Sequence, residues 1–395
     1  AERLRENLED QDVPVIVNFI LFRAHALGAS DIHVEPTAHS LLIRNRVDGI
    51  LHDEAVMPAA LHSEVASRIK ILSGMDVAEK RRPQDGRVSI NIHQNPIDVR
   101  VSTFPTVYGE KIVMRLLDQS SLMPSPDLLG LRPHELSMLI DGLNAPYGLI
   151  MLCGPTGSGK TTTLYSCLGS VDKSSKNVLT VEDPVEYQLK GINQVQVQRE
   201  VGMTFAMALR ALLRQAPNII MVGEIRDMET AEIAINASLT GHMVYSTLHT
   251  NDAPSAVSRL VDIGLKPYLV SASLRGVLAQ RLVRRICDNC KEAHEPEQHE
   301  LNLLGIQLDQ AADSVFMYGR GCSNCRNTGF RGRMGIFEIF AIDEEIEQMI
   351  YENCTLVELR NKARDLGMRT LREDGIRKVL AGQTTINEVL QTTVS

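Results

Sequence analysis

A glycine-rich turn between a strand-like and a helix-like segment constrains this chain more than any other feature. The apolar run at 148–153 leads into GPTGSGKTT (154–162), and the helix-forming segment TLYSCL follows. A strand, a loop of the pattern G-x-x-x-x-G-K-T and a helix together are typical of a loop that holds phosphates. The sequence therefore predicts a nucleoside triphosphate site and disfavours an ordinary glycine-rich turn.

Each position of this loop has a mechanical reason. Gly154, Gly157 and Gly159 are expected to adopt positive φ angles and to bring backbone N–H groups close to an anion. Lys160 is expected to reach the β and γ phosphates, and the Thr161 hydroxyl is placed to ligate Mg²⁺. The other loop residues expected to contact the nucleotide are Pro155, Thr156, Ser158 and Thr162.

Length and charge limit the other functions. A chain of 395 residues is expected to contain two or three cores. Its net charge of −8 disfavours a protein whose whole surface binds nucleic acid. Its apolar runs are too short to span a membrane, so membrane association is expected through a partner. Because the chain starts at Ala1 without a signal-like segment, we expect it to be a piece of a longer protein.

The apolar periodicity divides the chain into two parts. Helices over 13–27 and 58–72, and strands at 31–35, 41–46, 50–52, 87–93, 97–103 and 110–117, predict a small α+β domain over 1–118. Pro124 and Pro126 indicate a linker over 119–131. From 132 to 395, alternating strands and helices predict an α/β domain with a wound, mostly parallel sheet. Beyond Leu265 we expect mostly helices, with strands near Met334–Ile339.

Acidic residues and histidines flank the predicted strands. Glu224 follows the strand 219–222, and Glu182 ends the strand 177–182. Because parallel strands direct their carboxyl ends to one edge, both are expected near the loop, where Glu224 would handle Mg²⁺ or water. For Glu182 the alternative is a cap on the next turn. His249 is expected to face the γ-phosphate, whereas His242 is as well explained by a structural role.

Arginines are dense before the linker. They are Arg81, Arg82, Arg87, Arg100 and Arg115. Guanidinium groups stabilise the charge on a transferring phosphoryl group and often come from another domain. From the residues alone, however, ordinary ion pairs are favoured for Arg100 and Arg115.

Two C-x-x-C pairs, Cys287 with Cys290 and Cys322 with Cys325, are separated by 31 residues. Paired motifs of this kind supply four thiolates for a structural, tetrahedral Zn²⁺ that clips an inserted loop. This use of cysteine indicates a reducing compartment.

Together these segments resemble the secretion ATPases that drive type II secretion and type IV pilus assembly. The likeness covers essentially the whole chain. It is carried by ASDIHVEP (29–36), RRPQDGR (81–87), DVRVSTFPTVYGEKIVMRLL (98–117), GPTGSGKTTTLY (154–165), LTVEDPVEY (179–187), RQAPNIIMVGEIRD (214–227), GHMVYSTLHTND (241–252) and the four cysteines.

The resemblance implies a PAS-like first domain, a flexible linker and a RecA-like ATPase domain with a zinc-binding insertion (about 287–325) and C-terminal helices. It implies a homo-hexameric ring in the cytoplasm. The ring is expected to associate with the inner membrane through platform proteins, contacted by an N-terminal domain expected outside this sequence. The Walker A loop is 154–161. The resemblance further implies that Glu182 belongs to the Asp box, that Glu224 is an atypical Walker B acid, and that His242 and His249 form the His box, with His242 among the residues that contact the nucleotide. Glu224, together with Glu182, is then expected to position Mg²⁺ and the attacking water, and either acid is open as the base. Arg100 and Arg115 match arginines that reach the nucleotide, which reverses the ion-pair preference for both.

Within the family, SLRGVLAQRLVRRIC (273–287) favours the type II secretion branch over pilus extension, and the cysteine insertion disfavours pilus retraction. The leading hypothesis is therefore a Mg²⁺-dependent ATPase that powers type II secretion, with pilus extension as the alternative. A nucleic-acid motor would need a basic channel and stacking aromatics, yet the chain is acidic and has 8 Phe and 8 Tyr. A scaffold that binds ATP without turning it over is the third class.

Overall fold

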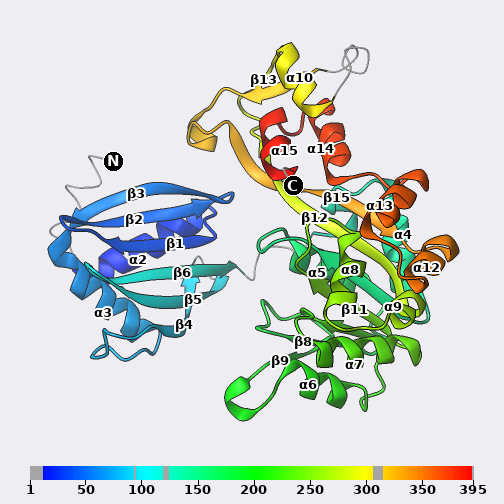
Figure 1. Cartoon of the computed structure of the whole chain (residues 1–395). Helices are drawn as coiled ribbons and strands as arrows, with labels where there is room; N and C mark the ends of the chain where they lie inside the picture. The colour runs from blue at the N-terminus through cyan, green and yellow to red at the C-terminus, as the bar shows by residue number, and fades with distance from the viewer. Residues whose placement is uncertain (1–11, 93–94, 119–123, 306–314, 394–395) are drawn as a thin grey trace. The chain divides into compact units, whose positions relative to one another are not determined.

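A computed structural model describes residues 12–92, 95–118, 124–305 and 315–393 (Figure 1). The chain divides into two compact units, 1–122 and 123–395, called unit 1 and unit 2 below. The domain boundaries predicted from the sequence, with a linker over 119–131, stay predictions. Residues 119–123 of that linker lie outside the described residues, and its described part contains the short 3₁₀ helix η2 (Pro126–Leu129).

Unit 1 is an antiparallel sheet with two helices on one face. The strands follow the order β3-β2-β1-β6-β5-β4. Alternate residues such as Ile32 and Val34 are buried in one core with Ile16 of the first helix and Ile69 of the second. The elements are α2 (Val13–Ala26), β1 (Asp31–Pro36), β2 (Ser40–Val47), β3 (Ile50–Pro58), η1 (Ala59–Leu61), α3 (His62–Leu72), β4 (Gln84–Ile92), β5 (Asn95–Thr106) and β6 (Gly109–Asp118).

The predicted α+β character of this part is confirmed, but several boundaries differ, and the strand expected at 50–52 is the nine-residue strand β3. The second helix was expected from Pro58, but β3 continues to Pro58 and α3 begins at His62. The backbone at Pro58 is extended, with φ −56° and ψ 138°, so the chain leaves the strand there and enters the 3₁₀ turn η1 before the helix.

Unit 2 is built on a seven-stranded sheet with the order β15-β12-β7-β11-β10-β8-β9. Six neighbouring strands are parallel, and β15 pairs with β12 in the antiparallel sense at one edge. This confirms the predicted wound, mostly parallel sheet. The strands are β7 (Gly148–Cys153), β8 (Val178–Glu182), β9 (Asn193–Gln196), β10 (Ile219–Val222), β11 (Met243–Leu248), β12 (Leu274–Ile286) and β15 (Phe330–Ala341).

Helices cover both faces of this sheet. Alternate residues of β7 show the layers, since Leu149 and Met151 join one core whereas Ile150 and Leu152 join the other. The first core contains residues of α6 (Phe205–Leu212), α7 (Met228–Leu239), α8 (Ser255–Asp262), α9 (Pro267–Ser273), α12 (Glu344–Tyr351) and α13 (Leu356–Asp365). The second contains residues of α4 (Pro133–Asn144) and α5 (Lys160–Ser170), and the 3₁₀ turn η3 (Arg199–Val201) precedes α6.

The expectation of mostly helices beyond Leu265 is wrong for the segment 274–286. The apolar spacing of Leu274, Val277 and Leu278 fits a helix, but the segment is the 13-residue strand β12. It lies between β7 and β15 and is paired with both. Tertiary packing between two strands therefore overrides the helical spacing.

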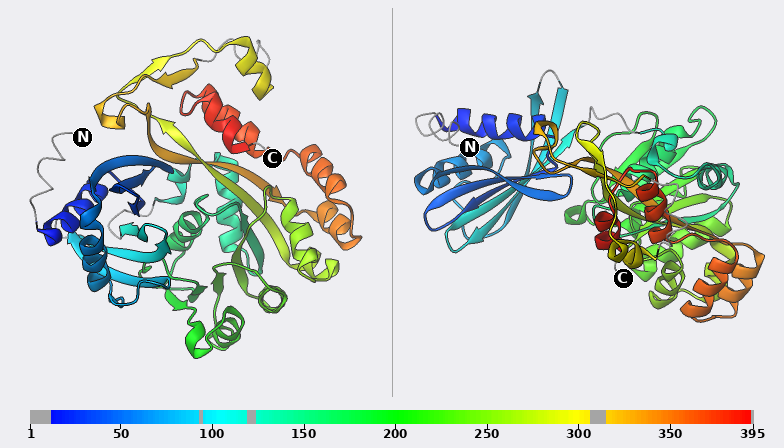
Figure 2. Two further views of the ribbon diagram at one scale, coloured as in Figure 1. Left: turned by 60° about the vertical axis from the view of Figure 1, so that its left-hand side comes forward. Right: turned by 90° about the horizontal axis from the view of Figure 1, so that it is seen from above.

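Strands β12 and β15 run side by side and lead to the four-cysteine segment (Figures 1 and 2). This segment holds a two-stranded sheet, a short helix and a 3₁₀ turn, and two C-terminal helices pack beside it. The elements are β13 (Lys291–Ala293), α10 (Gln298–Leu304), β14 (Met317–Gly319), η4 (Ser323–Cys325), α14 (Leu371–Leu380) and α15 (Ile386–Thr393). Within the described ranges, every helix is too short or too polar to cross a bilayer.

Candidate nucleotide site

The phosphate loop lies between the end of β7 and the start of α5. Gly154, Gly157 and Gly159 have φ angles of +144°, +79° and +90°, as predicted. A Cβ on Gly154 would lie 2.4 Å from the Gln280 carbonyl oxygen, so the backbone of β12 approaches the loop closely there. Because α5 begins directly after Gly159, its unpaired N–H groups and positive dipole end face the loop.

Lys160 is folded into this loop. Its Nζ donates hydrogen bonds to the carbonyl oxygens of Gly154 (2.6 Å) and Pro155 (3.0 Å). Burial lowers the pKa of Lys160, and the neighbouring Cys153 and Glu224 side chains oppose that effect. Thr161 is half-buried in the first turn of α5. The loop therefore offers an ammonium group and a hydroxyl beside its backbone N–H groups, which suits a phosphate with its Mg²⁺.

Glu224 and His249 lie together at the same edge of the sheet. They follow β10 and β11, which are neighbours, and β11 is next to β7. The Glu224 carboxylate accepts from Arg226 (2.5 Å between Oε1 and the guanidinium), and its Oε2 lies 3.7 Å from His249 Nε2. The His249 side chain is 50% exposed, whereas that of Glu224 is 13% exposed. The structure thus brings an acid and a histidine to the edge that carries the phosphate loop.

Glu182 has a different environment from Glu224. It is 3% exposed, and its carboxylate accepts hydrogen bonds from Tyr165, from Thr180 (2.5 Å) and from Gln194 (3.0 Å). Tyr165 belongs to α5, so this carboxylate fixes the helix of the phosphate loop against β8. Burial, together with Glu182, raises the pKa of the Tyr165 hydroxyl, which keeps it a hydrogen-bond donor. These contacts support a positioning role for Glu182 through Tyr165.

The structure does not bring His242 to the phosphate loop of its own chain. His242 precedes β11, whereas the loop and His249 follow the carboxyl ends of the strands. The six residues of β11 separate the two edges by about 20 Å, at about 3.3 Å per residue. The His242 ring contacts the Ala237 carbonyl oxygen through Nδ1 (3.0 Å), and its own carbonyl accepts from the Gly148 N–H (3.2 Å).

Gln280 is a residue of this site that the sequence did not indicate. It is 3% exposed on β12, and its Oε1 accepts a hydrogen bond from the Thr163 hydroxyl in α5 (2.8 Å). A Cβ on Gly159 would lie 2.7 Å from its Nε2. Because the segment was expected to be helical, nothing in the sequence placed this amide against the loop.

Glu338 on β15 is a further buried acid that the sequence did not indicate. It is 3% exposed and accepts from the backbone N–H groups of Ala253 (2.7 Å) and Leu371 (3.3 Å). Burial raises the pKa of Glu338 to about 7. Its carboxyl group therefore joins the segment after His249 to the start of α14, and its charge changes near neutral pH.

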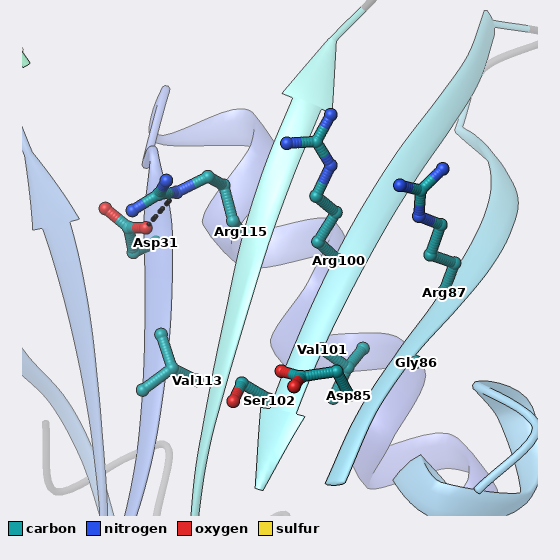
Figure 3. Close-up of a pocket in the computed structure, with 9 residues that line it drawn as sticks. All are labelled: Asp31, Asp85, Gly86, Arg87, Arg100, Val101, Ser102, Val113 and Arg115. Atoms are coloured by element: carbon teal, nitrogen blue, oxygen red, sulfur yellow. Dashed lines mark hydrogen bonds and ion pairs between the residues drawn. The ribbon is translucent and has the colours of Figure 1, made fainter. Parts of the chain in front are cut away.

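Three arginines of unit 1 line a pocket of about 430 Å³ on the sheet (Figure 3). Arg87, Arg100 and Arg115 lie side by side on β4, β5 and β6. Arg115 forms an ion pair with Asp31 on β1, with 2.9 Å between Nε and Oδ1. The expected ion pair of Arg115 is thus present, and it lies within a group of arginines.

The four cysteines form one cluster. All four Sγ atoms lie within 4.8 Å of one another, with separations of 3.7 Å for Cys290 with Cys325 and for Cys322 with Cys325. Four thiolates around Zn²⁺ at 2.3 Å are about 3.8 Å apart, so the donor set and its spacing are compatible with tetrahedral zinc. In the described ranges it is the one group of His, Cys, Asp and Glu side chains close enough to hold a metal ion.

Comparison with known proteins identifies the family. Residues 6–391 match the profile of the family described as "Type II/IV secretion system protein". The chain belongs to this family. It is 50% identical over 389 residues to the type II secretion system protein HxcR of Pseudomonas aeruginosa, which covers 98% of this chain and 79% of that protein.

Pilus motors of this family are also similar. The type IV pilus assembly ATPase PilB of Thermus thermophilus is 46% identical over 387 residues, which are 98% of this chain and 44% of that protein. Among solved structures, the pilus retraction motor PilT with bound ADP is 25% identical, with a TM-score of 0.62 and a match over 94% of this chain and 95% of that chain. The fold, the loop and the relatives are those of the family's ATPases.

Proposed function

We propose that this chain is a Mg²⁺-dependent ATPase that powers type II protein secretion. The observation that carries the proposal is the phosphate loop with Lys160, beside which the Glu224–His249 pair lies at one edge of the sheet. An acid at this position is suited to orient Mg²⁺ or the attacking water. The 50% identity with a type II secretion protein supports that branch over pilus extension.

The other groups have supporting roles in this proposal. Gly154 to Thr162 hold the triphosphate, Thr161 ligates Mg²⁺, and His249 faces the γ-phosphate. Glu182 positions α5 through Tyr165. His242 lies at the opposite edge of the sheet from the phosphate loop. Arg100 and Arg115 supply guanidinium groups to the transferring phosphoryl group, since such groups stabilise its charge.

The cluster of Cys287, Cys290, Cys322 and Cys325 holds a structural zinc ion, because four thiolates leave no open coordination position. The chain works as a homo-hexamer in the cytoplasm and acts on platform proteins of the inner membrane. The relatives named for type II secretion and for pilus assembly support a role in such a machine.

Phosphate release tests the proposed activity. Lys160→Ala removes the ammonium group of the loop and is expected to abolish ATP turnover. Glu224→Gln is expected to lower kcat by two orders of magnitude or more, since positioned acids and bases contribute about 10²- to 10⁴-fold. Glu229→Gln is the matched control, because Glu229 lies on the surface in an exposed pair with Arg210. Turnover of Glu224→Gln at the parent rate would contradict the assignment.

A further inference from the structure

The sheet register of unit 1 places five charged side chains in one row. Arg87 lies opposite Arg100, and Arg100 lies opposite Arg115. Asp31 lies opposite both Arg115 and Arg46 on the two neighbouring strands. Directly opposite residues share a face of the sheet, so five strands contribute to this row of Arg87, Arg100, Arg115, Asp31 and Arg46, called the arginine row below.

The arginine row carries an excess of three positive charges. Like charges directly opposite each other destabilise a sheet, and here two neighbouring pairs are arginine with arginine. Because neighbouring strands lie about 4.8 Å apart, the three neighbouring arginines span about 10 Å across the sheet. Such an array suits an extended polyphosphate better than a single small anion, because several guanidinium groups can pair with successive phosphates.

Asp31 is the carboxylate of the row. Its side chain is 9% exposed and fixed by the Ser30 hydroxyl (2.9 Å to Oδ2) and by Arg46 (3.6 Å). Its other oxygen accepts from Arg115, whose side chain is 57% exposed. The carboxylate is therefore held in place, whereas the arginine side chain is long and solvated. An anion that approaches the pocket competes with Asp31 for the guanidinium group of Arg115 (Figure 3).

We propose that Asp31 is an exchangeable counter-ion, which holds Arg115 on the sheet until a nucleotide polyphosphate takes its place. This rests on the proposed function, in which Arg115 supplies charge to ATP. Binding of ATP then breaks one ion pair inside unit 1 and forms another with phosphate. Asp31 thereby lowers the affinity for ATP and, to the same extent, favours the release of phosphates after turnover.

The steady-state KM for ATP in the full chain tests this role. Asp31→Asn removes the competing charge at nearly constant shape. The KM is therefore expected to fall about two- to fivefold, which corresponds to the energy of an ion pair with one solvated partner. Glu54→Gln is the matched control, because Glu54 on β3 forms an ion pair with Arg23 in the same unit and does not line this pocket. Its KM is expected to stay within the error of the parent value.

A double-mutant cycle makes the test specific. Arg115→Gln is expected to raise the KM, and Asp31→Asn added to it is expected to have no further effect. Asp31→Ser is a second neutral variant in case the amide impairs folding, and the melting temperature of each variant is recorded. Asp31→Glu keeps the charge and is expected to retain a KM close to that of the parent.

The outcomes separate this inference from the proposed function. Absence of turnover in the parent, or parent-like turnover in Lys160→Ala, would contradict the ATPase itself. If both behave as expected but folded Asp31→Asn or Asp31→Ser has an unchanged or higher KM, only the counter-ion role is overturned. A higher KM would show that Asp31 orients Arg115 for the phosphate.

Discussion

The hydrogen bond between Gln280 and Thr163 joins β12 to α5, and its contribution to stability can be measured by mutation. Both side chains are buried, since Thr163 is 0% exposed and Gln280 is 3% exposed. Gln280→Met leaves the Thr163 hydroxyl without this acceptor, and Thr163→Val leaves the Gln280 oxygen without this donor. An unpaired buried polar group costs about 1–3 kcal/mol, so each single variant is expected to lose that much stability.

The double variant distinguishes this pair from two independent sites. When both partners become apolar at similar volume, no buried polar group of the pair is left unsatisfied, so the loss is expected to be no larger than in one single variant. For a unit of this size, about 1–3 kcal/mol lowers the Tm by roughly 2–12 °C.

Thermal unfolding of the parent, both single variants and the double variant is the assay, with the Tm read from circular dichroism. Losses in the double variant that equal the sum of the two single losses would refute the coupling. Single variants that melt with the parent would show that this hydrogen bond does not hold β12 to α5.

Two further predictions concern zinc and pH. Cys322→Ser is expected to lose bound zinc and to lower the Tm, whereas Cys354→Ser, outside the cluster, keeps the metal; zinc retained in Cys322→Ser by elemental analysis would contradict the site. The folded pKa of Glu338, about 7, lies above its ordinary value of 4.5, so its protonation stabilises the fold fully below pH 4.5 and this contribution is lost as pH rises to about 7. Glu338→Gln is expected to flatten that part of the Tm–pH profile, and parallel profiles for variant and parent would show that another group is responsible.

The sequence was sufficient to predict the phosphate loop and the edge of the sheet at which Glu224 and His249 lie. Both inferences depend on a strand followed by a polar residue, and the carboxyl ends of parallel strands share an edge whatever their order. Glu182 shows the limit of that reasoning. It ends a strand as predicted, but its side chain faces the core and Tyr165, and the face of a single strand position depends on register.

Long-range pairing explains what the sequence did not reveal. The spacing of Leu274, Val277 and Leu278 suits a helix, so the approach of Gln280 to the loop depended on a strand that was not predicted. The arginine row has the same origin. Arg100 and Arg115 were each placed on a strand, but only the register of β1, β5 and β6 sets them beside each other and beside Asp31.

The central claim is that this chain turns over ATP as an assembled motor, with charge from arginines completing the site that the phosphate loop begins. The most direct measurement is specific ATPase activity across a range of protein concentrations, with the mass of the assembly determined in the same samples. The account predicts that activity per chain rises as rings form and that Arg115→Gln rings of the same mass stay slow. Constant activity per chain from monomer to ring, or Arg115→Gln rings as active as the parent, would contradict it.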